Sequence, residues 1–136
     1  MPADFELEAS CLAGMLDADG CIALFRNRTH YQPTVEVCQK SKANLTILQE
    51  LWGGNFIQGI PQADIEGSWH LRWTSKVDVQ YILGITYKYL KFKKGQADII
   101  LRYIDEVALG SPYKINQKKA ADLYAQFCEA RRKHYA

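Results

Sequence analysis

Hydrophobic and polar positions alternate along the chain with two different periods. The residues from about Leu7 to Leu16 suit a helix, and the period then changes, because residues 21–28 and 33–39 are strand-like. A polar stretch, residues 29–32, separates these two segments. The pattern therefore predicts a helix followed by a β-hairpin.

The next segment repeats this order. Ser41 precedes a run of helically spaced apolar residues that ends at Gly53 and Gly54, so we expect a capped helix there. Two strands, residues 55–60 and 68–74, flank a turn containing proline, aspartate and glycine. In the second strand, apolar and polar residues occupy opposite faces: Trp69, Leu71 and Trp73 on one, and His70, Arg72 and Thr74 on the other.

Helical patterns occupy the rest of the chain. Ser75 with Asp78 forms a capping-box start for a helix through about Leu83, and further helices are expected over 96–109 and about 116–132. This order predicts an α+β fold whose sheet has helices on one face. The 136 residues have the length of one domain, with a core over about 5–110 and a C-terminal helical segment over about 115–133.

Basic residues are concentrated in the second part of the chain. The net charge is +2, but residues 1–86 carry six Lys or Arg against ten Asp or Glu, whereas residues 87–136 carry eleven against five. This asymmetry indicates a polyanionic partner, although a solubilising tail has the same composition.

Cysteine spacing and hydropathy exclude several protein classes. Cys11, Cys21, Cys38 and Cys128 show no zinc-finger spacing, so we interpret them as reduced, mostly buried thiols. No basic leader precedes an apolar stretch, and no window approaches the roughly 18 apolar residues of a membrane span. We expect an intracellular protein that is neither secreted nor membrane-bound; organelle, phage and bacterial cytoplasm all stay open.

The first helix joins the first strand through nine informative residues, Leu12-Ala13-Gly14-Met15-Leu16-Asp17-Ala18-Asp19-Gly20. A helix face formed by Ser10, Ala13, Gly14 and Asp17 carries little side chain, so a second helix can approach it closely. Asp17 and Asp19 offer the hard oxygen ligands that Mg²⁺ or Ca²⁺ prefers. If two such helices meet, their Asp19 carboxylates come together, and divalent metal is the simplest way to neutralise them.

These nine residues resemble the LAGLIDADG motif of homing endonucleases, with conservative apolar replacements at Met15 and Leu16. The resemblance covers about the first 110 residues. It implies an αββαββα fold in which an antiparallel, saddle-shaped sheet lays its open face along double-stranded DNA. Because the chain has one motif, it resembles the members that pair as homodimers. Without the motif, an open sheet face would be interpreted as solvent-exposed.

The resemblance implies roles at the catalytic centre. Asp19 occupies the position of the metal-binding acid, and the backbone carbonyl of Ala18 is a further ligand. Asp17 is interpreted as structural, satisfying donors at a helix end or on the partner helix.

Two further catalytic residues follow from the same resemblance. Gln39 corresponds to a glutamine that organises water, and Lys93 corresponds to a lysine that reaches the catalytic pocket. Where related enzymes carry another basic residue, this chain has Ala43, and Lys42 is a candidate replacement.

Polar side chains on the open sheet face are expected to contact DNA. The main candidates are His70, Arg72, Thr74, Thr34 and Glu36, of which Glu36 can accept from cytosine and Arg72 can donate to guanine. On the first strand, polarity favours Arg26 and Arg28, whereas counting in register from Asp19 favours Ala23, Phe25 and Asn27. Weaker candidates are Gln58 and Gln32, the latter in the first hairpin turn. Lys91 and Lys94 belong to a lysine strip that is either phosphate-binding or a solvated loop.

The resemblance implies an intron-encoded homing endonuclease. It would hydrolyse both strands of a long, pseudo-palindromic DNA site across the minor groove, leaving short 3′ overhangs. Mg²⁺ is the expected cofactor, and Ca²⁺ is expected to support binding without cleavage. The alternative is a LAGLIDADG protein that does not cut DNA, either a DNA-binding regulator or an RNA intron maturase. The presence of Asp19, Gln39 and Lys93 favours cleavage.

Overall fold

The computed structural model describes residues 4–28, 30–58, 68–108 and 117–134. Within these residues the helices and strands follow the predicted α+β order. They are α1 (Asp4–Asp19), β1 (Gly20–Asn27), β2 (His30–Gln39), α2 (Lys42–Trp52), β3 (Asn55–Gln58), β4 (Trp69–Trp73), α3 (Lys76–Thr86), η1 (Tyr87–Tyr89), α4 (Lys94–Tyr103), η2 (Ile104–Ala108) and α5 (Gln117–His134). Of these, η1 is a 3₁₀ turn and η2 is a π-helical turn.

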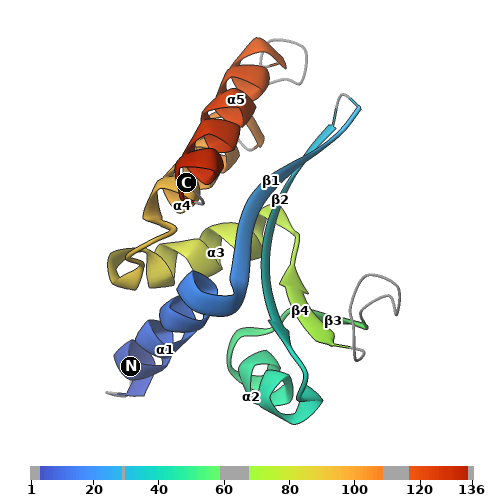
Figure 1. Ribbon diagram of the computed structural model, residues 1–136, viewed down its shortest axis with the longest axis vertical. Coiled ribbons are helices and arrows are strands. Elements are labelled where there is room, and N and C mark those ends of the chain that lie inside the picture. Colours follow the sequence, from blue (N-terminus) through green and yellow to red (C-terminus); the bar gives the residue numbers. More distant parts are fainter. Residues whose placement is uncertain (1–3, 29, 59–67, 109–116, 135–136) are drawn as a thin grey trace.

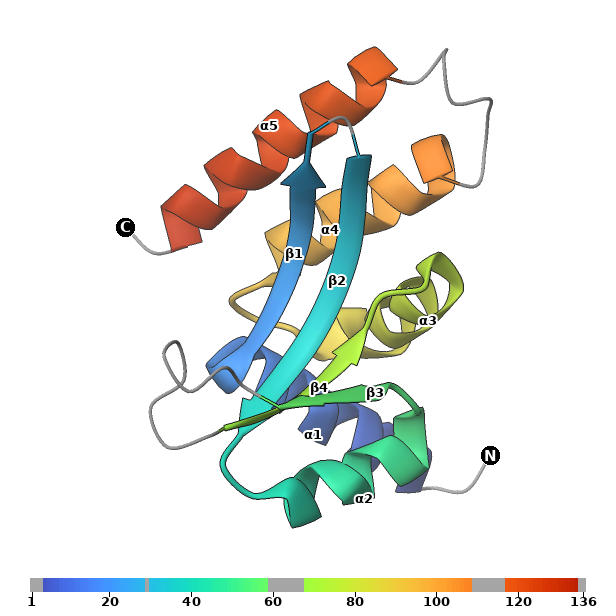
Figure 2. The same ribbon diagram turned by 90° about the vertical axis from the view of Figure 1, so that its right-hand side faces the viewer.

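The four strands form one antiparallel sheet in the order β1-β2-β4-β3. Helices α1, α3, α4 and α5 all lie on one side of it (Figure 1). A quarter turn brings the opposite side of the long, curved β1–β2 ribbon toward the viewer (Figure 2). We call this opposite side the open face. The arrangement confirms the expected one-sided sheet.

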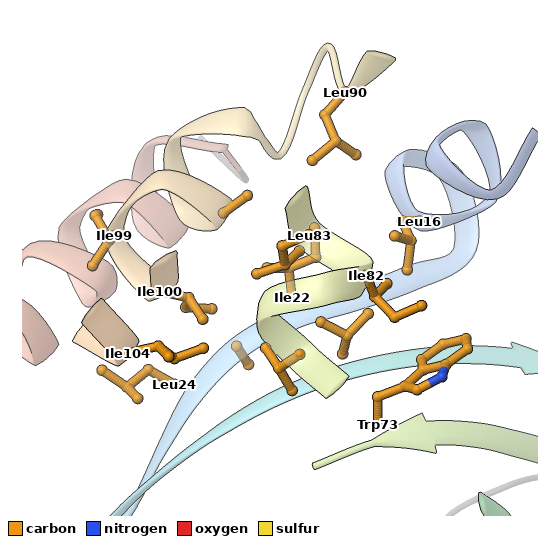
Figure 3. Packing of buried hydrophobic residues seen from close by; sticks show 14 of the residues in the cluster. Leu16, Ile22, Leu24, Trp73, Ile82, Leu83, Leu90, Ile99, Ile100 and Ile104 are labelled. Carbon is orange, nitrogen blue, oxygen red and sulfur yellow. The ribbon is translucent and has the colours of Figure 1, made fainter. Parts of the chain in front are cut away.

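The core fills the space between the sheet and these helices. Alternate strand residues such as Ile22, Leu24 and Trp73 meet apolar residues of α3 and α4, including Leu83 and Ile100 (Figure 3). All five side chains are almost completely buried. Each burial of this kind contributes about 1.5–3 kcal/mol to stability, so the core holds the sheet and the helices in a fixed arrangement.

Both predicted serine caps are present. Ser41 Oγ accepts from the backbone N–H of Asn44 at 3.3 Å, and Ser75 Oγ accepts from that of Asp78 at 3.0 Å. Helix α2 ends at Gly53, whose φ of 74° lies in the left-handed region that favours glycine. The polar residues before each helix therefore act as the sequence predicts.

The first hairpin differs from the prediction. Residues 29–32 were expected to connect the strands, but β2 already begins at His30. The turn includes Arg28, with a φ of 59°. The side chain of Tyr31 explains the longer strand, because its ring packs 5.5 Å from that of Tyr124 and 6.1 Å from that of Tyr103. These long-range contacts are invisible in the local polarity of the segment.

Candidate functional site

The carboxylate of Asp17 binds the segment that connects η1 to α4. It accepts hydrogen bonds from the backbone N–H groups of Lys91 at 2.7 Å, Phe92 at 3.2 Å and Lys93 at 3.0 Å. Hydrogen bonds to an ionised group are stronger than neutral ones. Asp17 thus has the structural position that was expected, with donors from the segment that leads into the N-terminal end of α4.

The side chain of Lys93 contacts the C-terminal end of α1. Its Nζ donates to the backbone carbonyls of Leu16 at 2.8 Å and Gly20 at 2.5 Å, and the residue is only 3% exposed. Burial lowers the pKa of Lys93, while the charges of Cys21, Asp17 and Asp19 oppose this shift. A cation is favourable here because the C-terminal end of a helix carries partial negative charge. We call these reciprocal contacts the Asp17–Lys93 clamp.

Gly20 lies where the clamp and the sheet meet. A Cβ atom at this position would lie 2.6 Å from the Cα of Leu16 and 3.0 Å from the carbonyl oxygen of Glu36. No real side chain fits at such a distance from backbone atoms. Glycine therefore permits the close passage from α1 into β1 that places Asp19 at the junction.

Asp19 is exposed, and within the described residues its carboxylate makes no hydrogen bond or ion pair. Ala18 beside it is also exposed. Mg²⁺ is commonly held by one or two carboxylates together with substrate phosphates and waters. The described parts of the chain contain no cluster of three metal-ligating side chains, and Asp17 is occupied by the clamp. Among the described residues, the end of α1 therefore offers one unengaged carboxylate, that of Asp19, which fits a site completed by other molecules.

Gln39 is the last residue of β2, and its side chain contacts α2. Its Oε1 accepts from Asn44 Nδ2 at 3.2 Å. The candidate replacement for the missing basic residue, Lys42, places its Nζ 4.6 Å from the centre of the Trp69 ring and 5.4 Å from that of Phe56. These cation–π contacts hold the Lys42 charge over aromatic rings.

Glu36 organises the polar side chains in the middle of the open face. Its Oε1 accepts from Arg72 Nε at 2.7 Å and lies 2.6 Å from Arg72 Nη2, and its Oε2 lies 3.3 Å from His70 Nδ1. Cys38 Sγ lies 3.9 Å from His70 Nε2 on the far side of that ring. The sequence predicted separate base contacts for Glu36 and Arg72, whereas the structure pairs the two side chains with each other.

The strand register decides between the two predictions for β1. Cys21, Ala23 and Phe25 pair with Glu36, Thr34 and Gln32, so the alternation places these β1 residues and Asn27 on the open face. Arg26 pairs with Tyr31 on the helix side, and Arg28 lies in the turn. Placing Arg26 and Arg28 on the open face by polarity was therefore wrong. Near the end of this edge strand, the helix side of the sheet is exposed to solvent, so an arginine side chain can lie there.

Three other predicted DNA contacts occupy unexpected positions. Thr34 is on the open face but only 3% exposed, so it was wrong to treat it as an accessible side chain. Gln32 belongs to β2 and not to a turn, and its Nε2 donates to the carbonyl of Thr74 at 2.6 Å. Thr74 itself follows the end of β4.

Two residues of β3 lie on the open face although the sequence did not predict them there. Asn55 pairs with Arg72, and Ile57 pairs with His70, on the neighbouring strand β4. Both residues therefore lie on the open face. The alternation could have identified them, because the apolar Phe56 between them pairs with the buried Leu71 and so faces the core. Gln58, the residue selected instead, ends the strand opposite Trp69.

The exposed face of α1 is rotated from the predicted one. Ala13 is completely buried in the chain's own core, so its assignment to a helix–helix contact was wrong. Ser10 is half-buried, and Gly14 is exposed with nothing within 4 Å of an added Cβ. Leu7, Cys11, Gly14 and Ala18 form the actual exposed stripe. Because Cys11 is exposed and the other three cysteines are half-buried, the expectation of mostly buried thiols was also wrong.

The lysine strip is divided among different environments. Lys91 is exposed, and Lys94 is half-buried with its Nζ 4.8 Å from the centre of the Tyr87 ring. Lys88 pairs with Glu6 at 3.0 Å. Only part of the strip is therefore available to an external anion.

Several solved structures that share this fold are homing endonucleases. The homing endonuclease I-CvuI in complex with its target, in the presence of Ca, is 22% identical over 95% of this chain and 85% of its own, with a TM-score of 0.78. The archaeal intron-encoded I-Vdi141I complexed with DNA is 15% identical over 92% and 84%, with a TM-score of 0.75. The LAGLIDADG homing endonuclease I-GzeII, 17% identical with a TM-score of 0.65, matches 86% of this chain but only 43% of its own.

Neither a family model nor a curated protein matches the chain. Within the described residues, no helix combines the length and apolar character that crossing a membrane requires.

Proposed function

We propose that this chain, which carries a LAGLIDADG-like motif on the fold of LAGLIDADG homing endonucleases, is a site-specific DNA endonuclease. It acts as a homodimer on a long, pseudo-palindromic duplex and hydrolyses both strands with divalent metal. The observation that carries the proposal is the exposed, unengaged carboxylate of Asp19 at the end of a clamped helix beside an open sheet face. The DNA complexes of I-CvuI and I-Vdi141I support the choice of substrate.

Different residues of the chain have separate roles in metal binding, water orientation and DNA recognition. Asp19, with the carbonyl of Ala18, would hold Mg²⁺, which when bound offsets charge on the phosphate and activates water. Gln39 engages Asn44 through its Oε1, which leaves its amide hydrogens to orient a water molecule. Lys93 places its positive charge at the end of α1 through the clamp. Arg72, Glu36 and His70 contact the base edges.

The homodimer follows from the incomplete ligand set. The described end of α1 offers one unengaged carboxylate, and two α1 helices meeting along their exposed stripes would bring two Asp19 residues together. I-GzeII supports this proposal because the match spans only 43% of that protein, as expected if one longer chain contains two such parts. An intron-encoded origin and an intracellular location stay predictions from the resemblance.

Gly14→Leu is expected to disrupt the dimer and leave the single chain folded. Gly14 is exposed, and an added Cβ atom has nothing within 4 Å of it, but a leucine there would clash with a helix packed on the stripe, at a cost of about 1–3 kcal/mol at each of the two sites. Sedimentation should show a monomer with unchanged helical content by circular dichroism. An active dimer with wild-type dissociation would rule out this interface.

Arg72→Ala is expected to cost about 1–3 kcal/mol of binding per half-site and to relax preference at one base pair. Because Glu36 holds the Arg72 guanidinium, Glu36→Gln should lose much of the same preference, and the double variant should cost less than the two single effects combined. Binding selections on randomised sites measure this coupling. Lys94→Ala is the control, because loss of a phosphate contact weakens all sequences alike. Strict additivity would show that Glu36 and Arg72 act independently.

Cleavage selection on a randomised plasmid library with Mg²⁺ tests the proposed activity and its target together. We expect recovery of one long sequence with approximate two-fold symmetry, and no cleavage when the metal is chelated. Specific binding of duplex DNA without cleavage would favour the regulator. Binding restricted to folded intron RNA would favour the maturase.

A further inference from the structure

Two arginines from distant parts of the chain lie at the outer edge of the sheet. Arg26 is an exposed residue of β1, the edge strand of the described sheet, on its helix side. Arg131 is an exposed residue in the last turns of α5, whose C-terminal end projects past β1 (Figure 2). Neither residue belongs to the open-face set described above.

An aromatic cluster connects the two positions. Tyr31, the cross-strand partner of Arg26, packs its ring 5.5 Å from that of Tyr124 on α5. The ring of Tyr124 lies 6.5 Å from that of the buried Phe127, and the Arg131 guanidinium carbon lies 5.5 Å from the centre of the Phe127 ring. The cluster thus packs α5 against the hairpin formed by β1 and β2, with Arg26 and Arg131 at its two ends.

The charges of both arginines reach the same hydroxyl. A hydrogen bond with Cys128 raises the pKa of Tyr124, and the charges of Arg131 and Arg26 oppose that rise. Burial raises the pKa of Cys21, on the open face, and Arg131 is again among the opposing charges. Both arginine charges therefore act on Tyr124, in the middle of the aromatic cluster.

We infer that Arg26 and Arg131 form a second DNA contact, a phosphate-binding edge outside the base-reading face. This inference rests on the proposed DNA binding. A duplex seated on a sheet exposes its sugar–phosphate strands along the sheet's edges, and guanidinium groups bind phosphate through paired N–H donors. Phosphate contacts position the protein without reading sequence. Arg131 is one of the basic residues that make residues 87–136 positively charged.

The test is the salt dependence of DNA binding. Arg26→Gln with Arg131→Gln should reduce the slope of log affinity against log salt by about two per bound chain, since each phosphate contact contributes about 0.9. Base preference in a randomised-site selection should not change. Lys118→Gln, at the other end of α5, is the matched control and should leave the slope at its wild-type value.

A second variant separates charge from packing. Arg26→Lys with Arg131→Lys should restore most of the slope, because a phosphate contact requires a cation more than a guanidinium; thermal unfolding of each variant checks that α5 stays in place. A glutamine variant that is folded and has a wild-type slope would overturn the phosphate edge while leaving the proposed nuclease intact. A changed base preference would instead reassign these arginines to base reading. A wild-type protein that binds no duplex DNA would overturn both proposals.

Discussion

Asp19→Asn is expected to lower the rate of DNA cleavage at least about 10³-fold while DNA binding survives. The substitution keeps the shape of the side chain but removes the carboxylate charge that would hold the metal at the end of α1, and electrostatic stabilisation of the developing charge is commonly the largest catalytic contribution. Asp19 is exposed and makes no described side-chain contact, so the free energy of unfolding should stay within about 0.5 kcal/mol of wild type. Single-turnover cleavage and fluorescence binding on one target measure the two effects separately.

The matched control is the same substitution two residues earlier. Asp17→Asn weakens three hydrogen bonds from residues 91–93, so it should destabilise the fold by about 1–3 kcal/mol. Its cleavage rate should fall much less than that of Asp19→Asn at temperatures where the fold persists. Cleavage by Asp19→Asn at the wild-type rate would show that another acid holds the metal.

Lys93→Met is expected to reduce both stability and cleavage. Methionine fills a similar volume but donates no hydrogen bonds, so the carbonyls of Leu16 and Gly20 lose their partner at a cost of about 1–3 kcal/mol each. Because those two carbonyls flank Asp19, the acid should also lose its fixed position, and we expect cleavage of bound DNA to fall about 10²-fold or more. Denaturant unfolding and single-turnover cleavage provide the measurements.

Lys91→Met is the control for loss of a lysine from the same strip. Lys91 is exposed and contributes only its backbone N–H to the clamp, so its substitution should weaken DNA binding slightly without altering the cleavage rate of bound DNA. If Lys93→Met reduces DNA affinity and the cleavage rate by the same factor, Lys93 contributes to binding the DNA backbone and is not part of the catalytic centre.

The sequence predicted the elements that depend on local patterns. Ser41 and Ser75 cap helices as expected because a cap depends on residues within one turn. The open face of β1 was predicted correctly by counting from Asp19, since strand alternation is strictly periodic. Polarity failed for Arg26 because exposure at a strand end depends on how far the covering helices extend.

Contacts between distant segments could not be predicted in the same way. The local sequence places Ala13 beside Gly14 on a small-residue face, but the packing of α1 on the sheet decides which of the two is buried. Glu36 and Arg72 are each plausible base readers, and only the pairing of β2 with β4 shows that they contact each other. Lys93 could be identified from its surrounding motif, but not the two carbonyls it binds.

The clamp also has a consequence for biosynthesis. Its contacts join positions 73 to 77 residues apart, so the acid-bearing end of α1 is secured only after the lysine-rich segment has left the ribosome and folded against it. Contacts of such long sequence separation form late, because the intervening loop must close first. A partly synthesised chain would therefore carry Asp19 on an unsecured helix end. We therefore expect the proposed nuclease activity to appear only after Lys93 has been synthesised and the clamp has formed.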